Sequence, residues 1–544
     1  MMPTAENLQR STTKISLTRL AALVLFILLA AATAYFAAFN ARFITLPGAQ
    51  EAREAAIPLT TGLILAGGQP YDLSSSPAIT NVYGVVYNYV VAPAAKVWGS
   101  TFAVHRAASL VFLLAGAALL YALQRKENTG RGLALAGAIF FYLFNVTTYA
   151  IGARPDTLGT AIYLAVVLLV WPDGSKVKPS MAKVALSIAL GVLAFYTKPY
   201  FVLALALATA ILFVSYGWRW AAAYAIGAGG IMAVSIPVVL HFWPYYLFEV
   251  YTTHIHSEAD PPGYFWLQAK DFLIMHTGLV LVVAGAGIVW IRKVAKMGSA
   301  PAKTTWSQWW PDAGIMCLLL SLGALSRLGG HAGAFRIYWE QLVTPFLILT
   351  ALRAVAHSER HLRAVGLSLL AFNALILLTW ARPMWPIDSS PERNAWQQLT
   401  AGRPWQLLPP SLLPDVAPDG VPVIENGQMT YFANLAMEYL PHQDPAYQRV
   451  LQYLLKVRTL IWQRRFDVIV SPNDFRVFIP PHFLSEHYEP HLVTFPIYFA
   501  DYNTPENYGL GERSYVAWVR KPGPEHSWAG NISPPPATIS ITTP

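Results

Sequence analysis

Long apolar runs separated by short polar loops fill the first 381 residues of the chain. Because a helix needs about 20 apolar residues to cross a bilayer, we predict about eleven membrane-spanning helices. They are expected at residues 16–40, 102–124, 132–151, 157–171, 184–197, 199–216, 220–242, 271–291, 312–326, 339–356 and 364–381. The first run is too long for a cleaved signal peptide and is expected to remain as an anchor.

The stretch between the first two apolar runs predicts two further helices. Glu54, Ile57, Thr61 and Ile64 recur at a spacing of three to four residues, which is typical of an amphipathic helix lying along a membrane surface. The sequence "NVYGVVYNYVVAPAAKVWG" follows, and it is aromatic but too polar at its start for an ordinary span. We expect a second interfacial or partly inserted helix there.

Residues 382–530 have a different pattern and are expected to form a separate domain. They are less hydrophobic and rich in proline, with strand-like runs "GVPVIE", "FDVIVS" and "SYVAWV" around the helix-like "PAYQRVLQYLLKVRTLIWQRR". This pattern predicts a small α/β domain beside the transmembrane domain of residues 1–381. The composition of residues 531–544, which include "SPPPATISITTP", is typical of a disordered tail.

Composition supports the membrane interpretation. Of the 544 residues, 55% are hydrophobic and 12% are charged, whereas soluble domains have roughly 25% charged residues. The single cysteine, Cys317, lies in an apolar run, so neither a disulfide framework nor a cysteine zinc site is available. The chain is therefore predicted to be a polytopic α-helical membrane protein surrounded by lipid.

The net charge of +9 comes from basic residues clustered in short loops, which is typical of topology signals and does not indicate a nucleic-acid partner. With the N-terminus inside, alternate loops contain most of the lysines and arginines, as the positive-inside rule requires. An odd number of spans then places the C-terminal domain outside the membrane. We expect a multi-pass protein of a bacterial plasma membrane, with a cytoplasmic N-terminus and an extracytoplasmic C-terminal domain.

Unusual polar residues gather at the outer ends of the predicted spans. Arg154 and Asp156 flank a proline between two apolar runs, where an ionised side chain is costly unless it faces a polar cavity or the membrane edge. The other outer elements contain "YTKPY", "TTHIHSEADPPGYFW" and "SRLGGHAGAFRIYWEQ". Because carboxylates, imidazoles and cations gather on this side, we expect any reactive site to face outward.

Several motifs in order make the chain similar to a known family. They are an acidic residue after the first span, then "LAGGQPYD", the tyrosine-rich stretch quoted above, "HRAASLVFLLAGAALLYALQRK" and "ARPDTLG". The chain resembles the GT-C glycosyltransferases that use lipid-linked sugars, in particular bacterial relatives of protein mannosyltransferases and of the lipid A aminoarabinose transferase. The resemblance covers about the first 220 residues well and the remainder loosely.

This resemblance implies a hexosyl- or pentosyltransferase that moves a sugar from a polyprenyl-phosphate carrier to an envelope lipid, glycan or protein. By position, the catalytic acid of the family falls on Glu54, with Glu51 one turn earlier as the rival. Asp156 matches the second outer acidic position, and Arg154 precedes it as in the family. Arg53 stands where members often have a second acidic residue, so the chain departs from the pattern there.

Transfer from such a donor needs a base for the acceptor proton and cations for the leaving phosphate. Glu54 is the candidate base, and Asp156 is a candidate for orienting the acceptor or holding Arg154. The candidate substrate-binding residues are Arg154, Lys198, Arg106, Tyr83, Arg327 and Arg336. His254 and His256 lie close to Glu258 and Asp260, which permits a divalent metal, although a His-x-His motif is a weak signal.

Other interpretations stay open at this point. Glu51 and Glu54 fit the solvated face of an interfacial helix, Arg154 and Asp156 fit a structural ion pair, and Lys198 fits a lysine that reaches the interface. At the level of the whole chain, the alternatives are a transporter of a lipid-linked substrate and a degenerate relative that serves as a scaffold in a membrane complex. Charges on one face and a large outer domain favour the enzyme over the transporter.

Overall fold

The computed structural model describes residues 17–50, 54–71, 81, 83–172, 178–252, 263–296, 313–328, 336–380, 385, 388, 390–408, 412, 423–425, 441–471, 481–500 and 508–522. By packing, the chain divides into two compact units. The first unit comprises Met1–Ile44, Arg106–Ser235 and Ala259–Pro386, and the second comprises Thr45–His105, Ile236–Glu258 and Ile387–Pro544. The predicted boundaries, residues 1–381 for the transmembrane domain and residues 382–530 for the C-terminal domain, remain predictions.

Helices make up the first unit in the described residues. They are α1 (Leu17–Thr45), α4 (Phe102–Lys126), α5 (Arg131–Val146), α6 (Asp156–Val170), α7 (Met181–Thr197), η2 (Pro199–Val202), α8 (Leu203–Tyr216), α9 (Trp218–Phe242), α11 (Tyr264–Met275), α12 (Thr277–Lys296), α13 (Ala313–Leu328), α14 (Arg336–Leu342), α15 (Thr344–His357) and α16 (Arg360–Thr379). A helix thus lies within or across each of the eleven predicted ranges, since apolar runs of this length favour helix in a chain that spans lipid. The ends of α1, α4 and α9 extend into the second unit.

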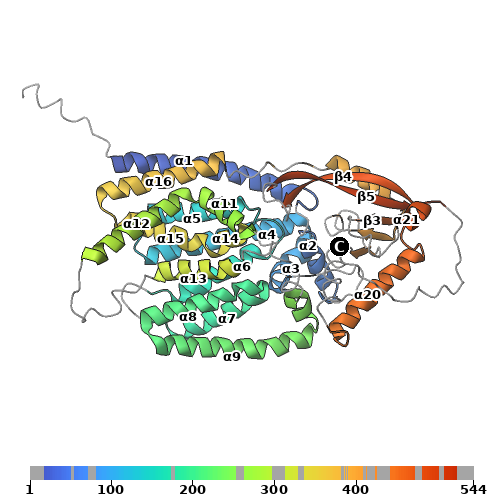
Figure 1. Ribbon diagram of the computed structural model, residues 1–544, viewed down its shortest axis with the longest axis horizontal. Helices are drawn as coiled ribbons and strands as arrows, with labels where there is room; N and C mark the ends of the chain where they lie inside the picture. The colour runs from blue at the N-terminus through green and yellow to red at the C-terminus, as the bar shows by residue number, and fades with distance from the viewer. Residues whose placement is uncertain are drawn as a thin grey trace, which may run out of the picture. The chain divides into compact units, whose positions relative to one another are not determined.

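Helix α15 forms the centre of this unit (Figure 1). It packs against α5, α12, α13, α14 and α16, and most of its side chains from Thr344 to Val355 are buried. Next to it, α6 packs against α7 and α8 and is buried along most of its length. Such close contact on all sides of a helix needs small and apolar side chains, and it leaves few positions for charge.

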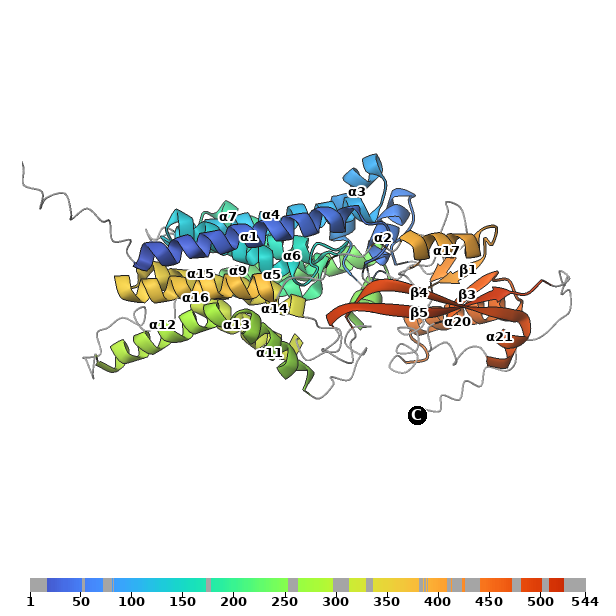
Figure 2. The same ribbon diagram turned by 90° about the horizontal axis from the view of Figure 1, so that it is seen from above.

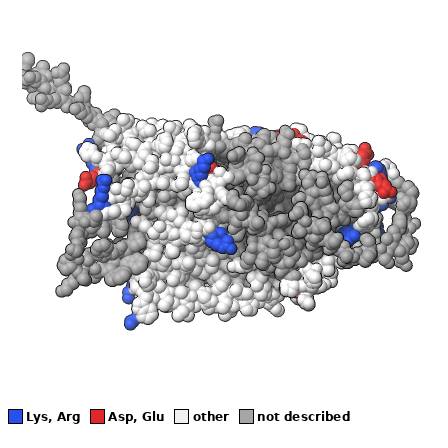
Figure 3. Space-filling view, in the orientation of Figure 1, with Lys and Arg blue, Asp and Glu red and all other residues white. Residues whose placement is uncertain are grey.

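The outer helices expose apolar side chains. On α9, for example, Trp218, Ile226 and Val234 are 66%, 75% and 68% exposed. Figure 3 shows few Lys, Arg, Asp or Glu side chains among the described residues over these helices. Among the described residues, five helices are long and apolar enough to cross a membrane, or six if one bent pair is one span, and further apolar helices are shorter. A surface of this kind is suited to lipid, and the total of about eleven spans stays a prediction.

A break within the range predicted as one span, residues 271–291, differs from the expectation. Helices α11 and α12 meet at His276 and are bent by 88° relative to each other. Asn373 of α16 stabilises this break, because its amide donates to the carbonyl of Met275 and its carbonyl accepts from the backbone of Leu279. The apolar pattern continues across the break, so the hydrophobicity of the sequence alone does not reveal it.

In the second unit, the chain after α1 forms α2 (Ala56–Leu65) and α3 (Val86–Trp98), which pack together. Asn88 joins them by donating to the carbonyl of Ile57 and to the hydroxyl of Thr61. Gly99 ends α3 at a φ of 83°, a value that favours glycine. Both helices lie where the sequence predicts them, and their position at a membrane surface remains a prediction.

The rest of the second unit contains a five-stranded sheet. Its elements are η3 (Phe248–Thr252), α17 (Ser390–Thr400), β1 (Gln406–Leu408), β2 (Val423–Glu425), α20 (Pro445–Trp462), β3 (Val468–Ser471), α21 (Pro481–His487), β4 (Tyr488–Ala500) and β5 (Tyr508–Arg520). The strand order is β2-β1-β3-β5-β4. Strand β1 pairs in parallel with β2 and β3, and β5 pairs antiparallel with β3 and β4, for example Ile469 with Trp518.

Each face of the sheet has its own core. Ile469 points to a cluster with the α20 residues Leu454 and Ile461, whereas the neighbouring Val468 and Val470 join a cluster with Trp396 of α17. This alternation follows from the two-residue period of a strand. Figure 2 shows α17 and the strands of this unit from above. The strand-like runs and the helix-like run of the sequence therefore lie in one α/β layer structure.

Candidate functional site

Asp156 lies at the beginning of α6 and is fully buried. Pro155, with a φ of −73°, precedes the helix and fits a turn into its first residue. An acidic residue in the first turn of a helix is favoured by the backbone dipole. One carboxylate oxygen, Oδ2, lies 3.2 Å from Nε of Arg154, so the two residues that flank the proline form an ion pair.

Lys198 approaches the same carboxylate from another helix. Its Nζ lies 2.7 Å from Oδ1 of Asp156, and its side chain is only 4% exposed. Lys198 ends α7 in an extended conformation, with φ −153° and ψ 130°, because the next residue is Pro199 and a residue before proline avoids the helical region. The sequence "TKPY" therefore ends the helix and turns the lysine toward Asp156.

The short helix α14 completes this cluster, which we name the Asp156 cluster (Arg154, Asp156, Lys198, Tyr200 and Gln341). Gln341 donates to Oδ1 of Asp156 at 3.3 Å and accepts from the Tyr200 hydroxyl at 2.6 Å. The Lys198 ammonium also lies 5.3 and 5.2 Å from the ring centroids of Tyr200 and Tyr338. Two cations, a carboxylate and aromatic faces thus meet in one buried place.

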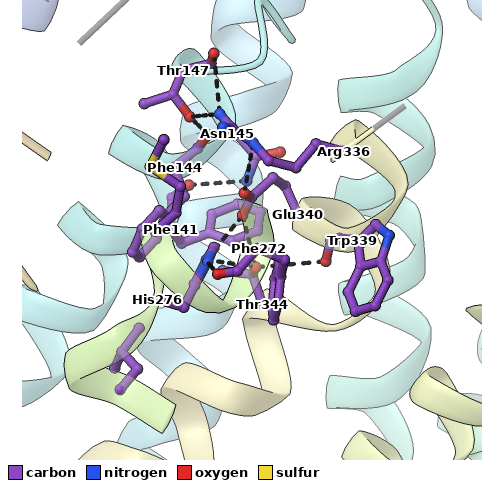
Figure 4. A network of polar contacts seen from close by, with 12 residues as sticks. Phe141, Phe144, Asn145, Thr147, Phe272, His276, Arg336, Trp339, Glu340 and Thr344 are labelled. Atoms are coloured by element: carbon purple, nitrogen blue, oxygen red, sulfur yellow. Dashed lines mark hydrogen bonds and ion pairs between the residues drawn. The ribbon is translucent and has the colours of Figure 1, made fainter. Parts of the chain in front are cut away.

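A second polar network involves other residues of α14 (Figure 4). Glu340 is fully buried, and its Oε1 lies 3.4 Å from Nε of Arg336 while its Oε2 lies 3.1 Å from Nε2 of His276. Thr344 donates to the same Oε2 at 2.8 Å. Arg336 in turn donates to the hydroxyl of Thr147 at 2.7 Å. Because Glu340 and Gln341 are neighbours, α14 joins this network to the Asp156 cluster.

In the second unit, Glu54 is buried just before α2. Its Oε2 accepts a hydrogen bond from the backbone N–H of Gln50 at 2.8 Å, so the carboxylate is bound to the backbone that follows α1. Nearby in this unit, the Ser100 hydroxyl donates to the carbonyl of Pro58 and lies 3.1 Å from Nε2 of His105. A buried carboxylate at this place does not fit the solvated face of a surface helix.

Tyr83 and Arg106 are both buried. The carbonyl of Tyr83 accepts from the hydroxyl of Tyr71, which joins the tyrosine-rich stretch to the "GGQPYD" motif. The Arg106 guanidinium donates to the carbonyl of Phe43 at 3.0 Å and lies 4.8 Å from the centroid of its ring. Arg106 thereby fixes the end of α1 within the first unit.

A further polar group, also in the second unit, was not predicted from the sequence. Glu249 of η3 is buried, and burial raises its pKa to about 7, although Arg449 of α20 acts in the opposite direction. The Arg449 guanidinium covers the ring of Tyr245 at 3.2 Å and donates to the carbonyl of Tyr71. The one signal in the sequence is an acidic residue within the aromatic run "WPYYLFEVY", and nothing there predicts its distant cation.

The remaining candidates are placed less completely. Glu51, His254 and His256 lie outside the described residues, so the rival acid and the proposed metal ligands stay predictions. Arg327 is on the exposed surface of α13. Within the ranges that the structure describes, no group of three or more His, Cys, Asp or Glu side chains is arranged to hold a metal ion.

Comparison with known proteins gives a distant likeness. No protein-family model and no curated protein matches the chain. One similar solved structure is ArnT from Cupriavidus metallidurans bound to undecaprenyl phosphate, with 14% identity, a TM-score of 0.48, and 91% of this chain and 97% of that chain covered. Another is the same protein in the apo state, with 14% identity, a TM-score of 0.46 and the same coverage. Neither activity nor residue roles follow from a likeness this distant.

Proposed function

We propose that this protein is a membrane glycosyltransferase that moves a sugar from a polyprenyl-phosphate carrier to an envelope acceptor. The observation that supports it most is the Asp156 cluster, because buried ionised residues among apolar helices are costly and usually mark a functional site. The ordered motifs of the sequence, from the acidic first loop to "ARPDTLG", support the same activity. The proposed site faces the outer side of a bacterial plasma membrane.

The chemistry needs an anion-binding site. An acceptor oxygen or nitrogen forms a bond to the anomeric carbon, the bond from that carbon to the phosphate oxygen breaks, and the polyprenyl phosphate leaves with the electron pair. A guanidinium and an ammonium held by the two oxygens of one carboxylate are suited to that phosphate. We assign this task to Arg154 and Lys198, and we assign to Asp156 the task of holding both in place.

We assign the acceptor proton to a carboxylate of the first outer loop. Glu54 is our choice, with Glu51 as the rival, because Glu54 is a buried carboxylate and a carboxylate can take a proton as the acceptor attacks. Arg106, Tyr83, Arg327 and Arg336 stay as candidate donor-binding residues. Of these, Arg336 is bound to Glu340 and Thr147.

Transfer of labelled sugar from a panel of polyprenyl-phosphate donors tests the proposal. Purified protein in lipid nanodiscs is compared as wild type, Asp156→Asn, Glu54→Gln and Glu51→Gln, each with its melting temperature. Glu127→Gln is the matched control, because it removes another carboxylate ion pair of the first unit, that with Arg353 at 2.9 Å. We expect transfer by wild type and control, and at least 100-fold less by Asp156→Asn and by the variant that lacks the base.

Two results would contradict the enzyme. If wild type binds undecaprenyl phosphate but transfers no sugar from any donor, the protein is a degenerate scaffold. If proteoliposomes move a lipid-linked sugar across the bilayer without transferring it, the protein is a transporter. If Asp156→Asn behaves like Glu127→Gln while wild type transfers sugar, the activity stands and the Asp156 cluster is a structural clamp.

A further inference from the structure

His276 lies at the break between α11 and α12, where the chain bends, and both of its ring nitrogens face defined partners. Nδ1 lies 2.9 Å from the carbonyl oxygen of Phe272, and Nε2 lies 3.1 Å from both Oε2 of Glu340 and the hydroxyl of Thr344. The ring itself is stacked between Phe144 and Phe272, with centroids 3.9 and 4.1 Å away. Its position is therefore fixed from every direction (Figure 4).

The contacts of His276 join it to Glu340 of α14. A carbonyl oxygen only accepts, so Nδ1 donates the hydrogen bond to the carbonyl of Phe272. Nε2, the Thr344 hydroxyl and Oε2 of Glu340 lie within 3.1 Å of one another, so the ring, the hydroxyl and the carboxylate form one closed group of polar contacts. Arg336 contacts the opposite carboxylate oxygen, Oε1, at 3.4 Å. His276, Glu340 and Arg336 thus lie in a row.

This row holds α14 at one end of the Asp156 cluster. Glu340 is fixed by His276, Arg336 and Thr344, and the next residue, Gln341, donates to Asp156. Tyr338 of the same helix lies against Lys198. Since α14 has seven residues and begins with Arg336, a shift of Glu340 would move both contacts together.

We propose that His276 is a positioning residue for the Asp156 cluster, acting through Glu340 and Gln341, and that it tunes the affinity of this cluster for a polyprenyl phosphate. The inference rests on the proposed function for the identity of the ligand. The link between the two networks rests on the contacts themselves. His276 needs no contact with the substrate for this role.

Two substitutions separate the hydrogen bond from the packing. His276→Phe keeps an aromatic ring between Phe144 and Phe272 but removes both ring nitrogens, whereas His276→Gln keeps a donor for Glu340. Ser187→Ala is the matched control, because it removes a buried hydroxyl of α7 that contacts Tyr224 at 2.9 Å and touches neither network. Glu340→Gln is the second route if His276→Phe does not fold.

The measurement is binding of undecaprenyl phosphate to the full-length protein in nanodiscs, together with the donor KM and kcat and the melting temperature. We expect His276→Phe to weaken binding and raise the donor KM about tenfold, with kcat changed less. We expect His276→Gln and Ser187→Ala to stay within about twofold of wild type. Equal binding by wild type and both the His276→Phe and Glu340→Gln variants would overturn the proposal.

A double-mutant cycle with Gln341→Ala tests the route. If His276 acts through Gln341, adding His276→Phe to Gln341→Ala weakens binding less than about twofold, since the link is already broken. Effects that multiply would show that His276 stabilises the fold without reaching the cluster. If wild type neither binds undecaprenyl phosphate nor transfers sugar, the proposed function fails. In that case the His276→Phe and Gln341→Ala cycle is measured by melting temperature. Additive losses would overturn the proposed link between His276 and Gln341.

Discussion

At the scale of single residues, the charges of the first unit are arranged in pairs that leave little room for substitution. Asp156 pairs with Arg154, which is close in sequence, and with Lys198, which is 42 positions away. Removing one member of a buried pair leaves its partner without compensation, and this costs more than the pair contributes. The neighbouring tyrosines and Gln341 add directed hydrogen bonds that set the geometry.

Asp156→Asn is therefore expected to destabilise the protein by about 3–5 kcal/mol, because Lys198 and Arg154 lose their shared carboxylate. The double variant Asp156→Asn with Lys198→Met is expected to melt higher than Asp156→Asn, since the buried ammonium is gone. Thermal unfolding in nanodiscs measures both. The more exposed pair of Glu127 with Arg353 is the control, and Glu127→Gln is expected to cost about 1 kcal/mol or less. Equal losses in the single and double variants would contradict this account.

Glu249 predicts a pH dependence of stability. Burial raises its folded-state pKa to about 7, above its ordinary value of 4.5, so the folded chain keeps a proton that the unfolded chain releases. This contribution is fully present below pH 4.5 and is lost as the pH rises through about 7, at a cost of about 3 kcal/mol. Melting temperatures of the wild type between pH 5 and 8 are expected to fall more steeply than those of Glu249→Gln. Parallel curves for the two proteins would refute the assignment.

At the scale of elements, the break between α11 and α12 is the feature that joins packing to the candidate site. Asn373 satisfies backbone groups on both sides of the break, and His276 at the break reaches Glu340. Close packing of α12 on α16 is required for these contacts. Gly278 permits it, since a Cβ there would meet the carbonyl oxygen of Leu369 and the Cβ of Asn373.

Gly278→Ala is expected to destabilise the protein by about 1–3 kcal/mol, because the added methyl group meets backbone and the two helices must separate. Gly285→Ala is the matched control on the same helix, where nothing lies within 4 Å of the added atom. It is expected to be neutral or to stabilise by up to about 1 kcal/mol. The two melting temperatures measure this difference, and a loss at Gly285 equal to that at Gly278 would count against the packing argument.

At the scale of the whole molecule, exposed apolar helices indicate lipid contact, and the distribution of basic residues predicts the orientation. The predicted inside loop around Lys183 and the C-terminal domain should lie on opposite sides of the membrane. Cys317 is the one cysteine of the chain, which makes labelling experiments simple. Its replacement gives a background in which single new cysteines report on topology.

In a Cys317→Ala background, Ser485→Cys is expected to react with a membrane-impermeant maleimide in spheroplasts. Lys183→Cys is expected to react only after the membrane is permeabilised, since this end of α7 is predicted to be cytoplasmic. Mass-tagged reagent and gel shift measure both. Labelling of Lys183→Cys in sealed spheroplasts, with Ser485→Cys protected, would reverse the predicted orientation.

Hydrophobic pattern alone located helices and strands well, because the length and period of an apolar run are local properties. The runs before and after "ARPDTLG" are helices α5 and α6, and "FDVIVS" contains β3. The same pattern predicted residues 271–291 as one span, because hydrophobicity does not indicate a bend that Asn373 of another helix stabilises. Arg154 and Asp156 were visible as a pair because they are close in sequence.

Tertiary structure decided the rest. Gln341 reaches Asp156 across 185 positions, and His276 reaches Glu340 from a distant helix. Such contacts depend on how helices pack, and no local pattern in the sequence specifies which distant side chain will satisfy a buried charge.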